Sequence, residues 1–400
     1  MTTPVNPAAV EDLSRHPRRT VTCCERGPRF GSAAPAQLHV DDPGELIAAL
    51  PAMVGFVPER SLVVAVLRGA PDHAGIPIID AVVRVDLEQD GVSRRGLATA
   101  FAEHVGRICV SENAGEVLAV IVDDRIREPA ARRSEVRRAT RTGPFGTLIA
   151  TFARLLVDDH DVVLGGAWAV RAIDKDERWW SLPDAERRGA LPDPATSMVT
   201  VAHVLDGRPI YRARSELTAM VATNYALREQ VAAELVDALT AAHLRYADAI
   251  RRGDPDGYHR QMLERVLWHI ANIEFGTRLA GGELAELAVA LRDRVVRDAL
   301  FALAVSDHAV AAERLWAELV RVLSDSDRAD AAALLGYSAY VRGDGPLAGI
   351  AFDAALEADP SHPMAILLDT ALRAGMRPDQ LRRLARSGVE TAADLGIELC

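Results

Sequence analysis

Five polar residues stand at the ends of apolar segments, where their side chains could bind a ligand: Arg60, Ser61, Asp86, Asp123 and Asp124. Carboxylates are preferred ligands of Mg²⁺, and an arginine guanidinium binds phosphate through paired hydrogen bonds. These residue types therefore fit a magnesium-dependent enzyme or a binder of a small phosphate-containing metabolite or nucleotide. Aspartates at strand ends also commonly cap turns and helices without any ligand, and this structural role is the favoured alternative.

The five residues meet only if three apolar segments form strands that run in particular directions. Residues 61–67 are a valine-rich apolar run, and residues 78–87 and 116–122 are two more. The short link after the first run predicts an antiparallel first pair, and the amphipathic helix expected at residues 91–110 predicts a right-handed parallel crossover from the second strand to the third. The polar residues then share one edge of the sheet, the position where open α/β sheets bind ligands. We call this set the strand-end rim.

A helix and a tight loop precede the first strand. Asp42 is a typical N-cap, Pro43 suits the first helical position, and Gly55 with Pro58 ends the helix. Further along, a helix is expected at residues 146–157, followed by strands at 167–173 and 178–182, the last containing Trp179 and Trp180. The pattern predicts an α/β domain with a mixed, mostly parallel sheet and flanking helices.

Three segments of this part carry a family resemblance: ALPAMVGFVPERSLVV at residues 49–64, RWWSL at 178–182 and GRPIYRARSELTAMV at 207–221. Together they resemble an actinobacterial family of domains of unknown function, numbered 4192. The family has no established activity, so the resemblance implies a fold and no chemistry. Some members carry cysteines just after the tryptophan pair; residues 183–192 contain none here, and no metal site is expected there.

Beyond the α/β domain the pattern becomes helical throughout. We expect a disordered arm at residues 1–36, where no hydrophobic period is present, and the α/β domain at residues 37–222. A helical connector at residues 223–296 and a tetratricopeptide-like helical region at residues 297–400 complete the predicted organisation.

One stretch near the C-terminus matches a tetratricopeptide unit at its small and aromatic positions. The matching residues are Leu335, Gly336, Ala348, Phe352, Ala355 and Pro360. Gly336 and Ala348 would allow two antiparallel helices to approach closely, with Phe352 filling the space between them. One unit cannot bury its own apolar face, so the flanking helices are needed whether the region is a helical cap or a concave partner-binding surface.

Composition narrows the classes of function. The net charge of −11 disfavours nonspecific nucleic-acid binding, although residues 125–141 are locally arginine-rich. No apolar run reaches the length of a membrane span, and the N-terminus lacks a secretory pattern, so a cytoplasmic protein is expected. The single lysine, Lys175, lies in no phosphate-loop or Schiff-base context, and the sequence contains no HExxH, GxSxG or CxxC motif.

Two hypotheses follow. The first is a noncatalytic protein-interaction or regulatory protein, with a partner at the helical region; it is favoured by the missing catalytic motifs, the repeat and the acidic surface. The second is a magnesium-dependent enzyme or phosphate-compound binder that uses the strand-end rim. No cofactor, catalytic residue or metal motif is indicated by residue spacing.

Overall fold

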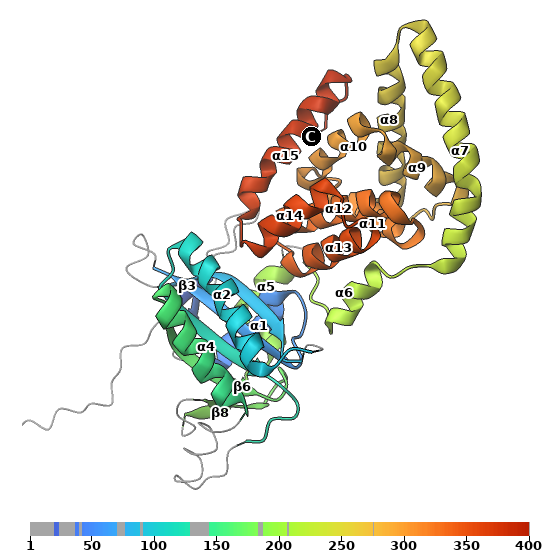
Figure 1. Ribbon diagram of the computed structural model, residues 1–400. Helices are drawn as coiled ribbons and strands as arrows, with labels where there is room; N and C mark the ends of the chain where they lie inside the picture. Colours follow the sequence, from blue (N-terminus) through green and yellow to red (C-terminus); the bar gives the residue numbers. More distant parts are fainter. Residues whose placement is uncertain are drawn as a thin grey trace, which may run out of the picture.

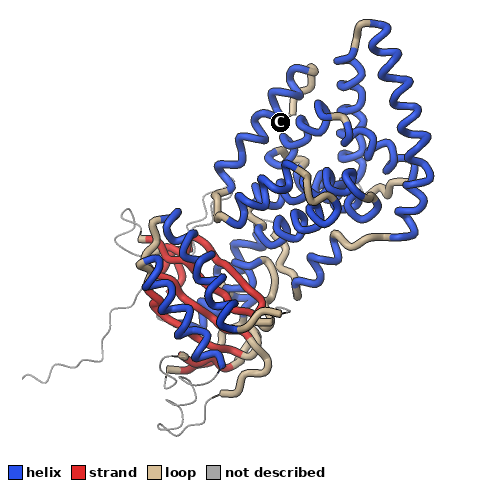
Figure 2. Tube along the Cα trace, in the orientation of Figure 1, coloured by secondary structure: helices blue, strands red, loops and turns tan. Residues whose placement is uncertain are grey.

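The computed structural model describes residues 20–23, 37–39, 42–69, 77–88, 91–128, 144–182, 187–205, 208–274 and 276–399. A sheet with helices on its faces forms the N-terminal part, and helices alone form the part that follows (Figures 1 and 2). The expected change from an α/β domain to an all-helical region is therefore confirmed within the described residues.

The sheet has eight strands in the order β2-β1-β4-β3-β5-β6-β7-β8 among the described residues. The strands are β1 (Thr20–Cys23), β2 (Gln37–His39), β3 (Ser61–Arg68), β4 (Ile78–Asp86), β5 (Glu116–Val122), β6 (Val163–Val170), β7 (Arg178–Ser181) and β8 (Arg188–Ala190). β1 falls within the segment expected to be a disordered arm, and β8 was not expected. The strand expected at residues 167–173 begins at Val163 instead, before its apolar half.

The prediction of a mostly parallel sheet is wrong. Of the strand pairs, only β1 with β4 and β5 with β6 are parallel; the other five are antiparallel among the described strands. The physical reason lies in the crossover from β4 to β5. The connecting helix carries the chain past β3, so that β5 joins the far edge of β3 and is antiparallel to it, although β4 and β5 still point in the same direction.

Alternate side chains of the central strands enter two separate cores. Leu62, Val64 and Val66 of β3 face one core, and Val63, Ala65 and Leu67 face the other, as a strand's period of two requires. The first core is covered by α2 (Arg94–Glu112) and α4 (Pro144–His160). The second is covered by α1 (Pro43–Val54), with η2 (Pro194–Thr196) and α5 (Met198–Leu205) beside it.

The tryptophan pair in β7 follows the same rule. Trp180 lies in the core under α2 and α4, whereas Trp179 lies in the core on the α1 side. Both are buried. Neither ring is therefore exposed as a binding platform, and each closes one face of the sheet near its edge.

Helices account for every described element after residue 208. They are α6 (Arg214–Met220), α7 (Tyr225–Arg252), α8 (Pro255–Glu274), α9 (Gly281–Arg292), α10 (Arg294–Leu300), η3 (Phe301–Val305), α11 (Ala309–Val322), α12 (Asp325–Arg342), α13 (Gly345–Ala358), α14 (Pro363–Arg373) and α15 (Pro378–Asp394). No described helix is long and apolar enough to cross a membrane.

The stretch predicted to be a tetratricopeptide-like unit forms the hairpin of α12 and α13. Phe352 is fully buried, and a Cβ on Gly336 would lie 2.3 Å from its ring, so the glycine leaves room for the aromatic side chain. Ala348 and Ala355 are also fully buried, whereas Pro360 lies exposed in the turn after α13. Residues 329–341 of α12 are buried on every side. This helix is a central packing element and has no free concave face.

The helical region packs against the sheet domain through one continuous core. The core on the α1 side includes residues of the sheet together with those of α12 and α13. Two hydrogen bonds also join the loop after α1 to the segment before α6. The Val57 amide donates to the Tyr211 carbonyl at 3.0 Å, and the Tyr211 amide donates to the Gly55 carbonyl at 2.9 Å. Arg377, just before α15, contacts Asp80 of β4 at 3.0 Å and also pairs with Glu112 of α2.

Candidate functional site

The strand-end rim is assembled by the register of three neighbouring strands. Ser61 at the start of β3 lies opposite Asp86 at the end of β4 and opposite Val122 at the end of β5. Asp123 and Asp124 follow directly after β5. Because β4 and β5 both run antiparallel to β3, the start of β3 lies beside the ends of β4 and β5. The five rim residues therefore lie together at one end of these three strands.

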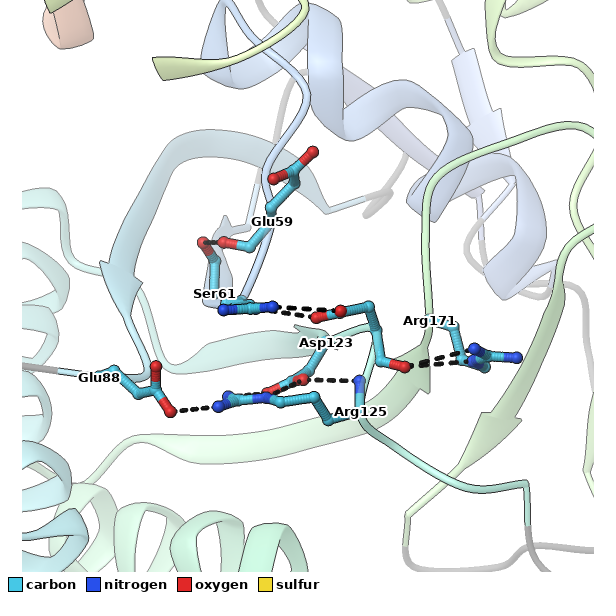
Figure 3. Close-up of polar contacts among 8 residues, drawn as sticks. Glu59, Ser61, Glu88, Asp123, Arg125 and Arg171 are labelled. Atoms are coloured by element: carbon cyan, nitrogen blue, oxygen red, sulfur yellow. Dashed lines mark hydrogen bonds and ion pairs between the residues drawn. The ribbon is translucent and has the colours of Figure 1, made fainter. Parts of the chain in front are cut away.

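Asp123 is buried and bound by Arg125. The Arg125 side chain donates to both Asp123 carboxylate oxygens, from Nε at 2.8 Å and Nη2 at 2.6 Å, and its amide donates at 2.9 Å (Figure 3). Glu88, just after β4, binds the remaining side of the same guanidinium. Burial alone would raise the pKa of Asp123, but the hydrogen bonds from Arg125 outweigh burial and lower it below the usual range.

Asp124 is exposed and bound by Arg60. The guanidinium donates to the two carboxylate oxygens at 2.9 and 3.2 Å, and these hydrogen bonds lower the pKa of Asp124. Arg60 has a backbone φ of 42°, in the left-handed region, at the turn where the loop enters β3. Arg171, after β6, donates to the Asp124 carbonyl at 3.4 Å (Figure 3).

The third carboxylate, Asp86, is held by Arg84 from the same strand. Residues two apart in a strand share a face, so Arg84 pairs with Asp86 and also donates from Nε to the Ser61 hydroxyl at 2.8 Å. Its guanidinium lies 5.3 Å from the ring centroid of Phe56 in the loop after α1. The Ser61 hydroxyl in turn donates to the Glu59 carbonyl. Burial lowers the pKa of Arg84 despite the adjacent Asp86.

Each rim carboxylate thus has its own arginine partner within the chain. No group of three or more histidine, cysteine, aspartate or glutamate side chains in the described part of the molecule is placed to hold a metal ion. The chemistry seen at the rim is charge-paired capping of strand ends. Arg84, Arg125 and Glu88 complete it but were not among the predicted residues; the Arg-x-Asp pattern at the end of β4 was the one sequence signal for them.

Two hollows adjoin the rim. One of about 670 Å³ lies between the loop after α1, the end of β4 and α6, and Arg60, Arg84 and Arg214 line it. The other, of about 540 Å³, lies on the β5–β7 side and is lined by Arg125, Arg127, Arg171 and Arg178 together with acidic residues and Trp180. Both are mixed in charge, with one more arginine than acidic residues in each lining.

A third candidate binding surface lies along β4 itself. β1 pairs with β4 only at Ile78 and Ile79, so no described strand covers the other edge from Asp80 to Asp86. All residues of β4 from Asp80 to Asp86 are half-buried. In the neighbouring strand β3, all residues from Ser61 to Leu67 are buried. A hollow of about 600 Å³ is lined by the successive residues 81–85. Because successive residues of a strand point to opposite faces, this hollow follows the edge of the strand. We call it the edge groove.

The backbone groups that face the edge groove can be assigned from the ladder between β3 and β4. The Leu87 amide donates to the Arg60 carbonyl at 2.8 Å, so Leu87, and by alternation Val85 and Val83, exchange hydrogen bonds with β3. The amides and carbonyls of Val82, Arg84 and Asp86 therefore point away from β3. Sequence reasoning did not find this feature, because an unpaired strand edge leaves no mark in residue types.

The family model described as a domain of unknown function (DUF4192) matches residues 43–379. This range contains the strand-end rim, all of β4 and the helical region as far as the start of α15. No curated protein and no solved structure matches the chain. The chain therefore belongs to the family of domains of unknown function DUF4192.

Proposed function

We propose that this chain is a noncatalytic protein-interaction protein that binds its partner in the edge groove, at the junction of the sheet domain and the helical region. The observation that carries this proposal is the edge of β4 from Asp80 to Asp86, which no described strand covers. Backbone amides and carbonyls need hydrogen-bond partners, and proteins normally cover or block a strand edge of this kind. An open edge that lies in a groove is a typical binding surface for another chain.

The helical region contributes one wall of this groove. Gly345, Pro346 and Gly349 of α13 line the hollow together with Leu372 of α14, opposite the residues of β4. Small residues at these positions keep the wall set back from the strand. The tetratricopeptide-like hairpin then acts as a support: buried α12 fixes α13 beside the sheet, and the partner is bound between the two parts of the molecule.

A substitution that fills the groove tests this function. Gly349→Trp places a large side chain at the groove wall, at a position where an added Cβ meets no atom closer than Leu372 at 3.6 Å. Ala233→Trp, at an exposed position of α7, is the matched control. A protein that co-purifies stoichiometrically with the wild type and the control should be lost with Gly349→Trp. Equal retention by Gly349→Trp would contradict the proposed surface.

A second candidate function is binding of a phosphate compound at the 670 Å³ hollow beside the rim. It is favoured by three converging arginines, of which Arg214 forms no ion pair with any described residue. Phosphate or a nucleotide, with or without Mg²⁺, should then raise the melting temperature, because preferential binding stabilises the folded state. Arg214→Ala should abolish this increase. An unchanged melting temperature of the wild type would leave the rim with a capping role only.

A further inference from the structure

From the edge groove we infer the class of partner: an extended peptide segment with apolar residues at its centre and acidic residues around them, which adds to the sheet as a strand beside β4. This inference rests on the proposed function and specifies its binding mode. The outward amides and carbonyls of Val82, Arg84 and Asp86 would pair with the backbone of the peptide.

The helices that line the groove on both sides favour a single extended segment. On one side, Leu97, Phe101 and Ile108 of α2 rise above the sheet edge. On the other side lie α1 and the α13–α14 wall, which Figure 1 shows next to the sheet domain. These helices stand where the neighbouring strands of a second sheet would have to lie. Walls on both sides of the edge therefore favour a lone strand, spaced about 4.8 Å from β4, over the sheet edge of a second copy of this chain.

The side chains that flank the edge are apolar on both sides. A bound strand would place alternate side chains beside the half-buried Val83 and Val85 on one face and beside the half-buried Met53 and Val82 on the other. Both environments favour aliphatic residues, since apolar burial contributes roughly 25 cal/mol per Å². This predicts consecutive aliphatic residues at the centre of the peptide.

The charged residues around the groove predict the flanking residues of the peptide. Four arginines line it, Arg84, Arg107, Arg214 and Arg373, against two aspartates, Asp353 and Asp369. Arg373 pairs with both aspartates, and Arg84 pairs with Asp86 of the rim. Arg107 lies 3.9 Å from the exposed Glu103, so Arg214 contributes most of the positive charge that is available to a ligand. Burial, together with the positive charges of Arg107 and Arg373, lowers the pKa of His104 at the same groove. In a chain with a net charge of −11, this locally basic groove is complementary to an acidic segment.

A synthetic peptide tests the inference directly. The probe is a fluorescein-labelled peptide of four central valines with two glutamates at each end, and its binding to the full chain is measured by fluorescence anisotropy. Two matched peptides serve as controls: one has lysines in place of the glutamates, and the other has all four valine nitrogens methylated. We expect the probe to bind and each control peptide to bind at least about tenfold more weakly, because charge pairing or backbone hydrogen bonding is lost.

Protein variants then place the bound peptide. Val82→Pro removes an outward amide, a change that an edge strand tolerates, and Gly349→Trp fills the groove. Both should weaken binding of the probe, whereas Ala233→Trp should not, and the melting temperature of each variant checks its folding.

Three outcomes would overturn the inference: no binding of the probe, equal binding of the methylated peptide, or binding that neither groove variant weakens. If the inference fails in one of these ways while Gly349→Trp still loses the co-purified protein, the proposed function stands and only the extended acidic partner is wrong.

Discussion

The strand-end rim and the edge groove meet at β4, whose last residue, Asp86, belongs to the rim, and they differ in which groups are left unpaired. At the rim, Asp86, Asp123 and Asp124 each pair with an arginine of the same chain. Along the groove, the side chains are mostly apolar, but the outward backbone groups of Val82, Arg84 and Asp86 have no described strand beside them. The rim contains the charged residues from which a sequence predicts a site. The groove, however, has more backbone hydrogen-bonding groups without a partner among the described strands.

This difference separates a structural from a binding role. A charged group that is already bound within the chain must break that contact before it meets a ligand, which reduces any gain from binding. A solvated strand edge exchanges water for a peptide backbone at little cost.

The largest effect should come from the support of the groove wall. Phe352→Ala removes a fully buried ring that fills the space left by Gly336, and it should lower the free energy of unfolding by roughly 3 to 5 kcal/mol. Ile366→Ala on the exposed face of α14 is the control and should change it by less than about 0.5 kcal/mol. Urea unfolding of both variants measures the difference. A near-zero loss for Phe352→Ala would mean that α12 and α13 do not pack as described.

The two edges of β4 should respond differently to proline. Val83→Pro removes an amide that bonds to β3 and leaves a buried carbonyl without its donor, a loss of roughly 1 to 3 kcal/mol. Val82→Pro removes only an outward amide and should cost less. Chemical denaturation compares the pair, and equal losses would contradict the assignment of inward and outward residues.

At the rim, burial should decide the effect of removing a charge. Asp123→Asn weakens the hydrogen bonds of a fully buried carboxylate and should cost roughly 1 to 3 kcal/mol at neutral pH. Asp124→Asn alters an exposed ion pair and should have a much smaller effect. A gain in stability from Asp123→Asn, measured by urea unfolding, would instead indicate unrelieved repulsion between the rim carboxylates.

The rim should also contribute to acid sensitivity. The folded-state pKa values of Asp123 and Asp124 are below their usual range, so the unfolded chain takes up protons first as pH falls. Their stabilisation is fully present above the unfolded pKa of about 3.9 and is lost as pH falls through the folded values. The Asp123→Asn variant should therefore lose less stability than the wild type between pH 6 and pH 3. Parallel pH profiles for the two proteins would show that Asp123 does not contribute.

Much of the fold follows from local sequence signals. The N-cap Asp42 accepts a hydrogen bond from the Gly44 amide, and the helix ends at Gly55 in a left-handed conformation, as the sequence predicts. The strand ends at Ser61, Glu116 and Val122 also agree with the prediction. Sheet order was not predictable in the same way, because whether β5 joins β4 or β3 depends on the path of α2 over the sheet.

The candidate sites show the same limit. Strand direction placed Arg60, Ser61, Asp86, Asp123 and Asp124 at one edge of the sheet, but residue types could not reveal that Arg84 and Arg125 neutralise them. The edge groove depends on where β1 stops pairing with β4 and on where α13 packs. Both are long-range features. The valines Val82, Val83 and Val85 are equally compatible with a central strand and with an edge strand.

Amide hydrogen exchange of the full-length chain, resolved by residue, tests the central claim most directly. In the free protein, the Val83 and Val85 amides should be protected by β3, while the amides of Val82, Arg84 and Asp86 exchange fast. Adding the valine–glutamate peptide should slow exchange at the latter three and leave Val83 and Val85 unchanged. Strong protection of the outward amides without any peptide would show that the chain itself covers this edge, and it would contradict the edge groove as a binding surface.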